Sequence, residues 1–303
     1  MGGSIPNLRR PVVVHKLWVI TAALLFSTGG TAIKFSSFTA WQIASFRSAI
    51  AVVLLTLLMP HWRTWWRPQS LMVGAAFGAT LVLFVTANTL TTAANAIFLQ
   101  YSAPLYILIL GPKLLGEANR PRDFALMAVL ATGILLLFFG QQAAVGTAPD
   151  PAVGNMFGLA AGVTWALTIM GLRWLALQPG VTNASGTAVV AGNAIACLVC
   201  LPMAFPLNEP TLVDWGVVIY LGVVQTSLAY VCLLRGLDHL RTIEATLLLL
   251  IEPVTAGIWA WLVHGEVPGS AALLGSGLIF AAVVFEAVQG SDDPVTSVGE
   301  QTE

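Results

Sequence analysis

Long apolar segments separated by short polar links extend over nearly the whole chain. Ten can be counted, bounded by proline, glycine or charged residues, and they cover residues 16–35, 40–59, 70–91, 94–115, 123–140, 154–175, 184–206, 212–235, 242–264 and 271–289. Each is close to the length of about 20 residues that a helix needs to cross a hydrocarbon core of about 30 Å. The pattern predicts an all-α integral membrane protein with ten transmembrane helices.

The composition supports a membrane location, because 57% of the 303 residues are hydrophobic and only 9% are charged. A typical soluble domain has about 25% charged residues, and its exterior needs polar cover that this chain does not supply. The excess apolar surface must face lipid, so the bilayer is an expected partner. The near-neutral balance of 13 basic and 14 acidic residues gives no indication of a nucleic-acid partner.

Basic residues in the links predict the orientation of the spans. If the chain begins in the cytoplasm, the cytoplasmic links and span ends collect eleven of them: Arg9, Arg10, Lys16, Arg63, Arg67, Lys113, Arg120, Arg122, Arg173, Arg235 and Arg241. The opposite side collects only Lys34, and Arg47 lies inside the second span. Because cytoplasmic links carry an excess of lysine and arginine, we predict that both termini are cytoplasmic.

The two halves of the chain share a series of residues in the same order. Three features of the fourth segment return 149 residues later in the ninth: Asn95-Ala96 as Glu244-Ala245, Pro104 as Pro253, and Gly116-Glu117 as Gly265-Glu266. A repeat of five spans is odd, so the second copy must cross the membrane with opposite orientation. Inverted repeats are typical of secondary transporters, because two pseudo-symmetric halves can open a shared site to each side in turn.

We therefore predict two five-helix repeats, residues 16–140 and 154–289, joined by a periplasmic linker at residues 141–153. Residues 1–15 are predicted to form a cytoplasmic tail, and the polar residues 290–303 a disordered cytoplasmic tail. We expect a monomer with a central cavity between its two repeats.

Glycines at intervals of four mark two of the predicted helices. They are Gly74 and Gly78 in the third segment, and Gly154, Gly158 and Gly162 in the sixth. Faces with small residues at this spacing let helix backbones approach closely in a membrane, so the pattern predicts close helix packing.

The stretches Pro104…Gly116-Glu117 and Glu252-Pro253…Gly265-Glu266 resemble the drug/metabolite transporter superfamily, specifically its ten-span proteins built from two EamA-type repeats. Arg47 also fits a position where that family often carries arginine. Within the superfamily, the chain is most similar to bacterial exporters of aromatic amino acids. The resemblance implies export of amino acids or related metabolites through a central cavity, across the bacterial cytoplasmic (inner) membrane.

Pro104 and Pro253 lie near the midpoints of the fourth and ninth segments. Proline inside a helix removes a hydrogen bond and clashes with the preceding turn, which a membrane protein tolerates where neighbours or a cavity satisfy the freed carbonyl. Their matching repeat positions favour a role as hinges that line the cavity. The alternative is that proline is simply frequent in spanning helices.

Glu252 is predicted to lie close to the bilayer centre, where an ionised carboxylate is costly and should face the bundle interior. Two roles remain open for it. It binds a coupling proton or a substrate ammonium group, or it stays protonated and bonds to backbone freed by Pro253. On a helix, Glu252 shares one face with Thr255 and Trp259, and also with Glu244.

Polar and aromatic residues predict the rest of the substrate pocket. The candidates are Trp165, Tyr101, Asn95, Gln100, Gln225, Glu244 and Arg47. Aromatic walls with a few amide groups suit an amphiphilic molecule, and Arg47 would attract a substrate carboxylate. Three alternatives stay open: Trp165 as packing, Glu244 at the water boundary near Arg241, and Arg47 extending outward to lipid or loop groups.

Other classes of function lack their motifs. The sequence has no zinc-protease, serine-hydrolase or phosphate-loop motif, so we expect no catalytic residues, metal, cofactor or ATP. A receptor or scaffold has no evident use for inverted repeats with broken helices. The nearer alternative is a carrier of a sugar nucleotide, drug or lipid, although phosphate-bearing cargoes would want more basic groups than Arg47 and Lys34. We predict a secondary transporter that exports aromatic or other apolar amino acids by alternating access, with protons as a candidate coupling ion.

Overall fold

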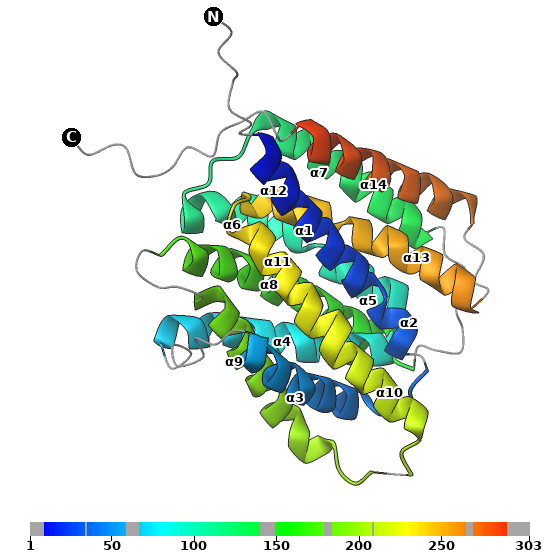
Figure 1. Ribbon diagram of the computed structural model, residues 1–303. Coiled ribbons are helices and arrows are strands. Elements are labelled where there is room, and N and C mark those ends of the chain that lie inside the picture. The colour runs from blue at the N-terminus through cyan, green and yellow to red at the C-terminus, as the bar shows by residue number, and fades with distance from the viewer. Residues whose placement is uncertain are drawn as a thin grey trace, which may run out of the picture.

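The computed structural model describes residues 9–33, 35–58, 67–91, 93–139, 149–178, 184–207, 209–264 and 269–289. Within these ranges, helices occupy all ten predicted apolar segments (Figure 1). Six spans are single helices, namely α3 (Ala40–Leu58), α4 (Pro68–Leu90), α7 (Pro121–Phe139), α8 (Pro151–Ala176), α9 (Ala184–Cys200) and α14 (Ser270–Gln289). A short 3-10 turn, η2 (Leu201–Met203), follows α9.

The other four spans are each divided into shorter helices. The first consists of α1 (Arg9–Ser27) and α2 (Gly29–Ile33), and the fourth of α5 (Ala93–Gln100) and α6 (Ala103–Leu115). The ninth consists of α12 (Thr242–Leu249) and α13 (Ile251–His264). The eighth runs through α10 (Leu212–Tyr220), the π-helix η3 (Leu221–Leu228) and α11 (Ala229–Leu237).

Length and apolar character fit a bilayer. Seven helical stretches among the described residues are long and apolar enough to cross a membrane, and the fourth and tenth spans contain the shorter apolar helices Ala103–Leu115 and Leu273–Phe285. Large apolar side chains such as Leu57, Met156 and Leu198 are exposed on the outside of the bundle, where lipid replaces water as their neighbour. The prediction of an all-α membrane protein is confirmed.

Proline and glycine set several helix boundaries. Pro68, Pro121 and Pro151 begin α4, α7 and α8, at the position where a helix needs no N–H donor. Asp150 caps α8, because its Oδ1 accepts a hydrogen bond from the Val153 amide at 3.2 Å. Gly116 ends α6 with a positive φ of 68°, which favours glycine.

The two halves of the chain interleave instead of forming separate lobes. α4 packs against both α8 and α9, α1 packs against α11, and α7 packs against α14 (Figure 1). Each of these contacts joins a helix of the first half to a helix of the second. The core is therefore built between the halves, and neither half buries its apolar surface alone.

The chain enters and leaves the bundle at one end. The start of α1 and the end of α14 lie at this end, which we call the inner end (Figure 1). There the His15 and His239 rings stack with centroids 3.7 Å apart, and His15 Nδ1 lies 2.9 Å from the Arg235 carbonyl oxygen. Burial, and next the adjacent His15 ring, lower the pKa of His239 below its usual range.

At the opposite end, which we call the outer end, one carboxylate joins two segments of the chain. Asp214, in the first turn of α10, accepts hydrogen bonds from the Ser36 hydroxyl at 2.9 Å and from the Ser37 amide and hydroxyl. It also accepts from the amide and hydroxyl of Thr211, the N-cap of the same helix. The link between the first and second spans is thereby tied to the start of the eighth span.

Glycines permit the closest helix contacts. Gly74 and Gly78 of α4 face the backbone of α9 around Gly192, and Gly162 of α8 faces the Leu99 carbonyl and the Ser102 side chain. A Cβ on Gly192 would lie 2.5 Å from Phe77 Cδ1 and 2.7 Å from the Gly74 carbonyl oxygen. The close packing predicted from the glycine spacing is confirmed at these contacts.

Replacing Gly192 with alanine should lower the free energy of unfolding by about 1–3 kcal/mol, because the added methyl group cannot be accommodated without moving α4 from α9. Gly277→Ala is the matched control, since a Cβ there would meet nothing within 4 Å. Thermal unfolding of the purified protein, followed by tryptophan fluorescence, compares the two. Equal melting temperatures for both variants would contradict this assignment.

Candidate substrate site

The proline of the ninth span creates a break at mid-membrane. Pro253 has no N–H, so the Leu249 carbonyl oxygen, four residues earlier, loses its partner in the helix. α12 ends at Leu249 and α13 begins at Ile251, which places the break at Leu250. The fourth span breaks between Gln100 and Ala103, at the matching repeat position.

Tyr101 connects the two breaks. It lies in the break of the fourth span, and its hydroxyl lies 3.3 Å from the Leu249 carbonyl oxygen and 2.6 Å from Glu252 Oε2. The carbonyl freed by Pro253 thus lies within reach of a donor from the other half of the chain. Because a hydroxyl has one hydrogen, Tyr101 either donates to the Glu252 carboxylate, or accepts from the protonated carboxyl group and donates to Leu249. The Glu252 side chain is partly exposed.

Arg47 is a buried cation in the second span. Its side chain is 2% exposed, and its Nε and Nη2 atoms have no hydrogen-bond partner among the residues that the structure describes. A buried guanidinium group without an acceptor is costly. Tyr230 of α11 lies within electrostatic range of both Arg47 and Glu252. A cation and a carboxyl group therefore both lie near the Tyr230 ring.

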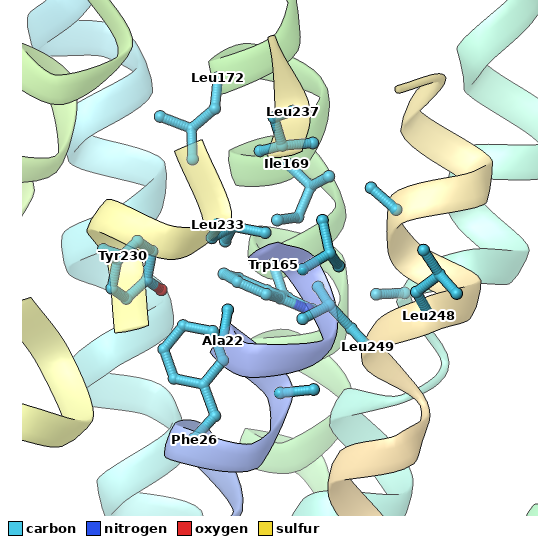
Figure 2. Close-up of a cluster of buried hydrophobic side chains, with 14 of the residues drawn as sticks. Ala22, Phe26, Trp165, Ile169, Leu172, Tyr230, Leu233, Leu237, Leu248 and Leu249 are labelled. Carbon is cyan, nitrogen blue, oxygen red and sulfur yellow. The ribbon is translucent and has the colours of Figure 1, made fainter. Parts of the chain in front are cut away.

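Aromatic rings surround Tyr230. Its ring centroid lies 4.6 Å from Phe77, 5.1 Å from Phe26 and 6.4 Å from Trp165, the last with perpendicular planes. Figure 2 shows the Trp165 side chain between Tyr230 and the α12 residues Leu248 and Leu249. We call Arg47, Tyr101, Trp165, Tyr230 and Glu252 the central group.

An open groove lies toward the outer end. It has a volume of about 610 Å³ and is bounded by α2, α10 and α13, with Thr28, Thr31, Ala32, Phe35, Val213, Gly216, Val217, Tyr220, Trp259 and Val263 as its lining. Two hydrogen bonds involve its lining residues, from Trp259 Nε1 to the Ser27 hydroxyl at 3.0 Å and from the Tyr220 hydroxyl to Thr28 Oγ1 at 2.8 Å. We call this the outer groove.

One face of α13 leads from the outer groove to the central group. Glu252, Thr255 and Trp259 recur at helical spacing, so they share that face. Trp259 lines the groove, and Glu252 lies seven residues, or about 10 Å, deeper along the helix. This face extends from the groove toward a partly exposed carboxyl group near mid-membrane.

The side of Trp165 toward the inner end is filled with aliphatic side chains. Figure 2 shows Ile169, Leu172, Leu233 and Leu237 on one side of the indole ring, with Ala22 and Phe26 on the other. Ile169, Leu172, Leu233 and Leu237 are at most 1% exposed. We call these four residues the inner plug. The outer groove thus opens at the outer end, and aliphatic side chains fill the inner side of Trp165.

The structure brings together only part of the predicted pocket. Tyr101, Trp165, Arg47 and Glu252 belong to the central group, as described above. Trp165 is 6% exposed and packed on its inner side, so it has the packing role that the sequence left open as well as a place beside Tyr230. Pro104 and Pro253 lie at the two helix breaks.

Gln225 and Glu244, two of the other pocket candidates, contact residues outside the central group. Gln225, on η3, packs against Gly29 of α2. Gln100 is half-buried and ends α5. The Asn95 side chain lies outside the described residues. Glu244 is not beside Trp165: it lies at the start of α12 within 3.7 Å of Arg122 and Arg241, the boundary position that was its alternative.

Tyr230 and the outer groove are absent from the prediction. A tyrosine within an apolar span was the available signal for Tyr230, and the helical face shared by Glu252 and Trp259 was the signal for the groove. A π-helix precedes Tyr230, so the face on which Tyr230 lies cannot be derived from a spacing of 3.6 residues per turn.

A multi-span helical protein with two interleaved halves, helices broken at mid-membrane and charged groups buried between them is a membrane transporter. Comparison with known proteins agrees: the profile of the EamA-like transporter family matches residues 15–139 and again residues 152–286. The chain belongs to this family, within the drug/metabolite transporter superfamily. It is a multi-pass membrane transporter with two repeats and not an enzyme.

Curated relatives span nearly the whole chain. The pseudopaline exporter CntI of Pseudomonas aeruginosa (strain UCBPP-PA14) is 27% identical, covering 88% of this chain and 94% of the relative. The threonine/homoserine exporter RhtA of Escherichia coli (strain K12) is 23% identical over 91% and 92% of the two chains. One crystal structure, 21% identical, has a similar fold with a TM-score of 0.70 over 92% of this chain and 99% of that one.

Replacing Tyr101 with phenylalanine should lower the free energy of unfolding by about 1–3 kcal/mol, because the Leu249 carbonyl and the Glu252 carboxyl group lose a buried donor. Tyr106→Phe is the matched control, since the Tyr106 hydroxyl makes no hydrogen bond within the described part of the chain and its loss should cost less than about 0.5 kcal/mol. Denaturant titration in detergent measures both. A Tyr101→Phe variant as stable as Tyr106→Phe would disprove the bridging role.

Proposed function

We propose that this protein exports amino acids with aromatic or other apolar side chains across the bacterial cytoplasmic membrane. Export proceeds by alternating access, through a site formed by the central group between the two repeats. The observation that carries the proposal is the placement near Tyr230 of both the partly exposed Glu252 and the buried Arg47, whose Nε and Nη2 atoms have no hydrogen-bond partner among the described residues.

Arg47 provides the carboxylate half of the site. Its Nε and Nη2 atoms are two donors on one edge of the guanidinium group, which is the geometry that binds a carboxylate through two parallel hydrogen bonds. A bound carboxylate also supplies the acceptors that this buried cation lacks. Binding thereby removes a cost that the empty site carries.

Glu252 and the aromatic rings provide the other half. A carboxylate attracts the substrate ammonium group, and Tyr101 fixes its position through the 2.6 Å hydrogen bond. Tyr230, Phe26 and Phe77 present ring surfaces that suit an apolar or aromatic side chain. The outer groove, at about 610 Å³, falls in the range of small-molecule sites and would provide the exit.

The relatives support this class of cargo. RhtA is named as an exporter of threonine and homoserine, which are amino acids. CntI is named as an exporter of pseudopaline. Both names describe export, which is the direction that we propose for this chain.

Arg47→Gln should reduce phenylalanine export from proteoliposomes about tenfold or more, because hydrogen bonds between a cation and a carboxylate contribute roughly 1.5–3 kcal/mol. The same variant should leave phenethylamine, which has no carboxylate, little affected, so the preference between the two substrates falls. Arg67→Gln, which removes an exposed arginine, is the matched control.

Two outcomes would count against the proposal. An unchanged preference in Arg47→Gln would remove Arg47 from the site. Failure of the parent protein to move any amino acid, together with transport of a sugar nucleotide, drug or lipid, would favour the other cargoes of the superfamily.

Glu252→Gln should abolish the stimulation of export by an outside-acid proton gradient, because we propose that one carboxylate binds the substrate ammonium group and the proton in turn. Exchange of internal labelled for external unlabelled phenylalanine, which needs no proton, should persist in the variant with a raised KM, because glutamine keeps an acceptor oxygen for the ammonium group but loses the charge. Glu209→Gln, at an exposed residue between the seventh and eighth spans, is the control. A normal response of Glu252→Gln to the gradient would disprove proton coupling at this residue.

A further inference from the structure

A group of buried ion pairs lies at the inner end, beyond the inner plug. Glu117 follows α6, and its Oε1 lies 3.2 Å from Arg173 Nε, near the end of α8. Its other oxygen accepts a hydrogen bond at 2.9 Å from the Thr242 amide, the first residue of α12. One carboxylate of the first repeat therefore joins two helix ends of the second.

Arg173 extends the connection to a third helix. Its Nη1 donates to the carbonyl oxygens of Leu237 at 2.8 Å and Asp238 at 3.0 Å, where α11 ends. A cation at the carboxyl end of a helix satisfies carbonyls that have no partner in that helix. Glu117 and Arg173 together tie the inner ends of the fourth, sixth, eighth and ninth spans.

A second set of pairs lies beside the first. Arg241 Nη2 lies 3.2 Å from Asp123 Oδ2 and donates to the Ala118 carbonyl oxygen at 2.6 Å. Glu244 lies within 3.7–3.9 Å of Arg120, Arg122 and Arg241. We call Glu117, Asp123, Arg173, Arg241 and Glu244 the inner ion cluster.

The inner ion cluster is largely buried, with side-chain exposures of 1% for Asp123, 5% for Arg173, 8% for Glu244, 12% for Arg241 and 15% for Glu117. Removing one partner of a buried pair leaves an uncompensated charge, so such pairs are costly to break singly. The lining of the outer groove, by contrast, is joined by two hydrogen bonds between neutral side chains.

We propose that the inner ion cluster is the closure of the inner end, and that it must separate before a substrate can pass the inner plug. Glu117 follows the split fourth span and Arg173 lies near the end of α8 in the packed centre, so a movement of the split spans against α8 would break their pair. The ions keep the inner end closed, and the loss of any one partner shifts the population toward a conformation that is open at this end. This role presumes the proposed transport cycle but not the proposed cargo.

Cys232 provides a native reporter of this closure. It lies in α11, buried in the same apolar cluster as Leu233, between Tyr230 and the inner end. In a Cys197→Ser/Cys200→Ser background, a membrane-impermeant methanethiosulfonate is applied to inside-out and to right-side-out vesicles. Glu117→Gln should raise the rate of Cys232 labelling from the inner side about tenfold, with no rise from the outer side.

Controls separate closure from general loosening. Arg173→Gln should give the same increase, and the double variant no more than either single one, because both remove one interaction. Asp150→Asn, a similar loss of charge at the outer end, should leave inner-side labelling unchanged. Leu172→Cys in a cysteine-free background repeats the measurement within the inner plug.

Two results would overturn the proposal. Inner-side labelling of Glu117→Gln at the parent rate would show that the cluster does not close this end. An equal rise from both sides, with a lowered melting temperature, would show that the cluster only stabilises the fold. Because labelling needs no substrate, either result is distinct from a failure to transport amino acids.

Discussion

A lipid bilayer offers no hydrogen-bond partner to a broken helix, and this constraint organises the middle of the protein. Pro253 interrupts the ninth span and frees the Leu249 carbonyl oxygen. The Tyr101 hydroxyl, in the matching break of the fourth span, lies within hydrogen-bond distance of it. The same hydroxyl meets Glu252, so the repair of the backbone also positions an ionisable group. The symmetry of the repeat thus brings both breaks to one place.

Interleaving of the repeats explains how the two ends can differ. Because α4, α8 and α9 pack through glycine contacts, the centre of the bundle is rigid and closely packed. The differences between the inner and outer ends therefore arise in the split spans, which lie beside this centre. The inner end has aliphatic side chains beside a cluster of ions, and the outer end has an apolar groove whose lining residues make neutral hydrogen bonds.

The fold can be predicted well from the sequence, because each spanning segment must be apolar and long enough to cross the bilayer. Segment lengths, basic links and the 149-residue offset of Pro104 and Pro253 can all be read directly along the chain. All ten segments are helical. The site is harder to predict. Glu244 shares a helical face with Glu252 in the sequence, but the break at Leu250 and the arginines of distant links place it among the inner ions. Such contacts depend on how helices pack, which no periodicity within one segment contains.

The π-helix η3 has a mechanical consequence for the eighth span. Asp214 fixes one end of this span to Ser36 and Ser37, and Arg173 holds the carbonyls at the other end. A helix whose two ends are fixed can change its twist only between them. In the eighth span, this part contains the π-helix Leu221–Leu228, whose turns are wider than those of an α-helix. If the outer part of the eighth span rotates relative to its inner part, the change in twist would occur in this π-helix, which packs against the second span.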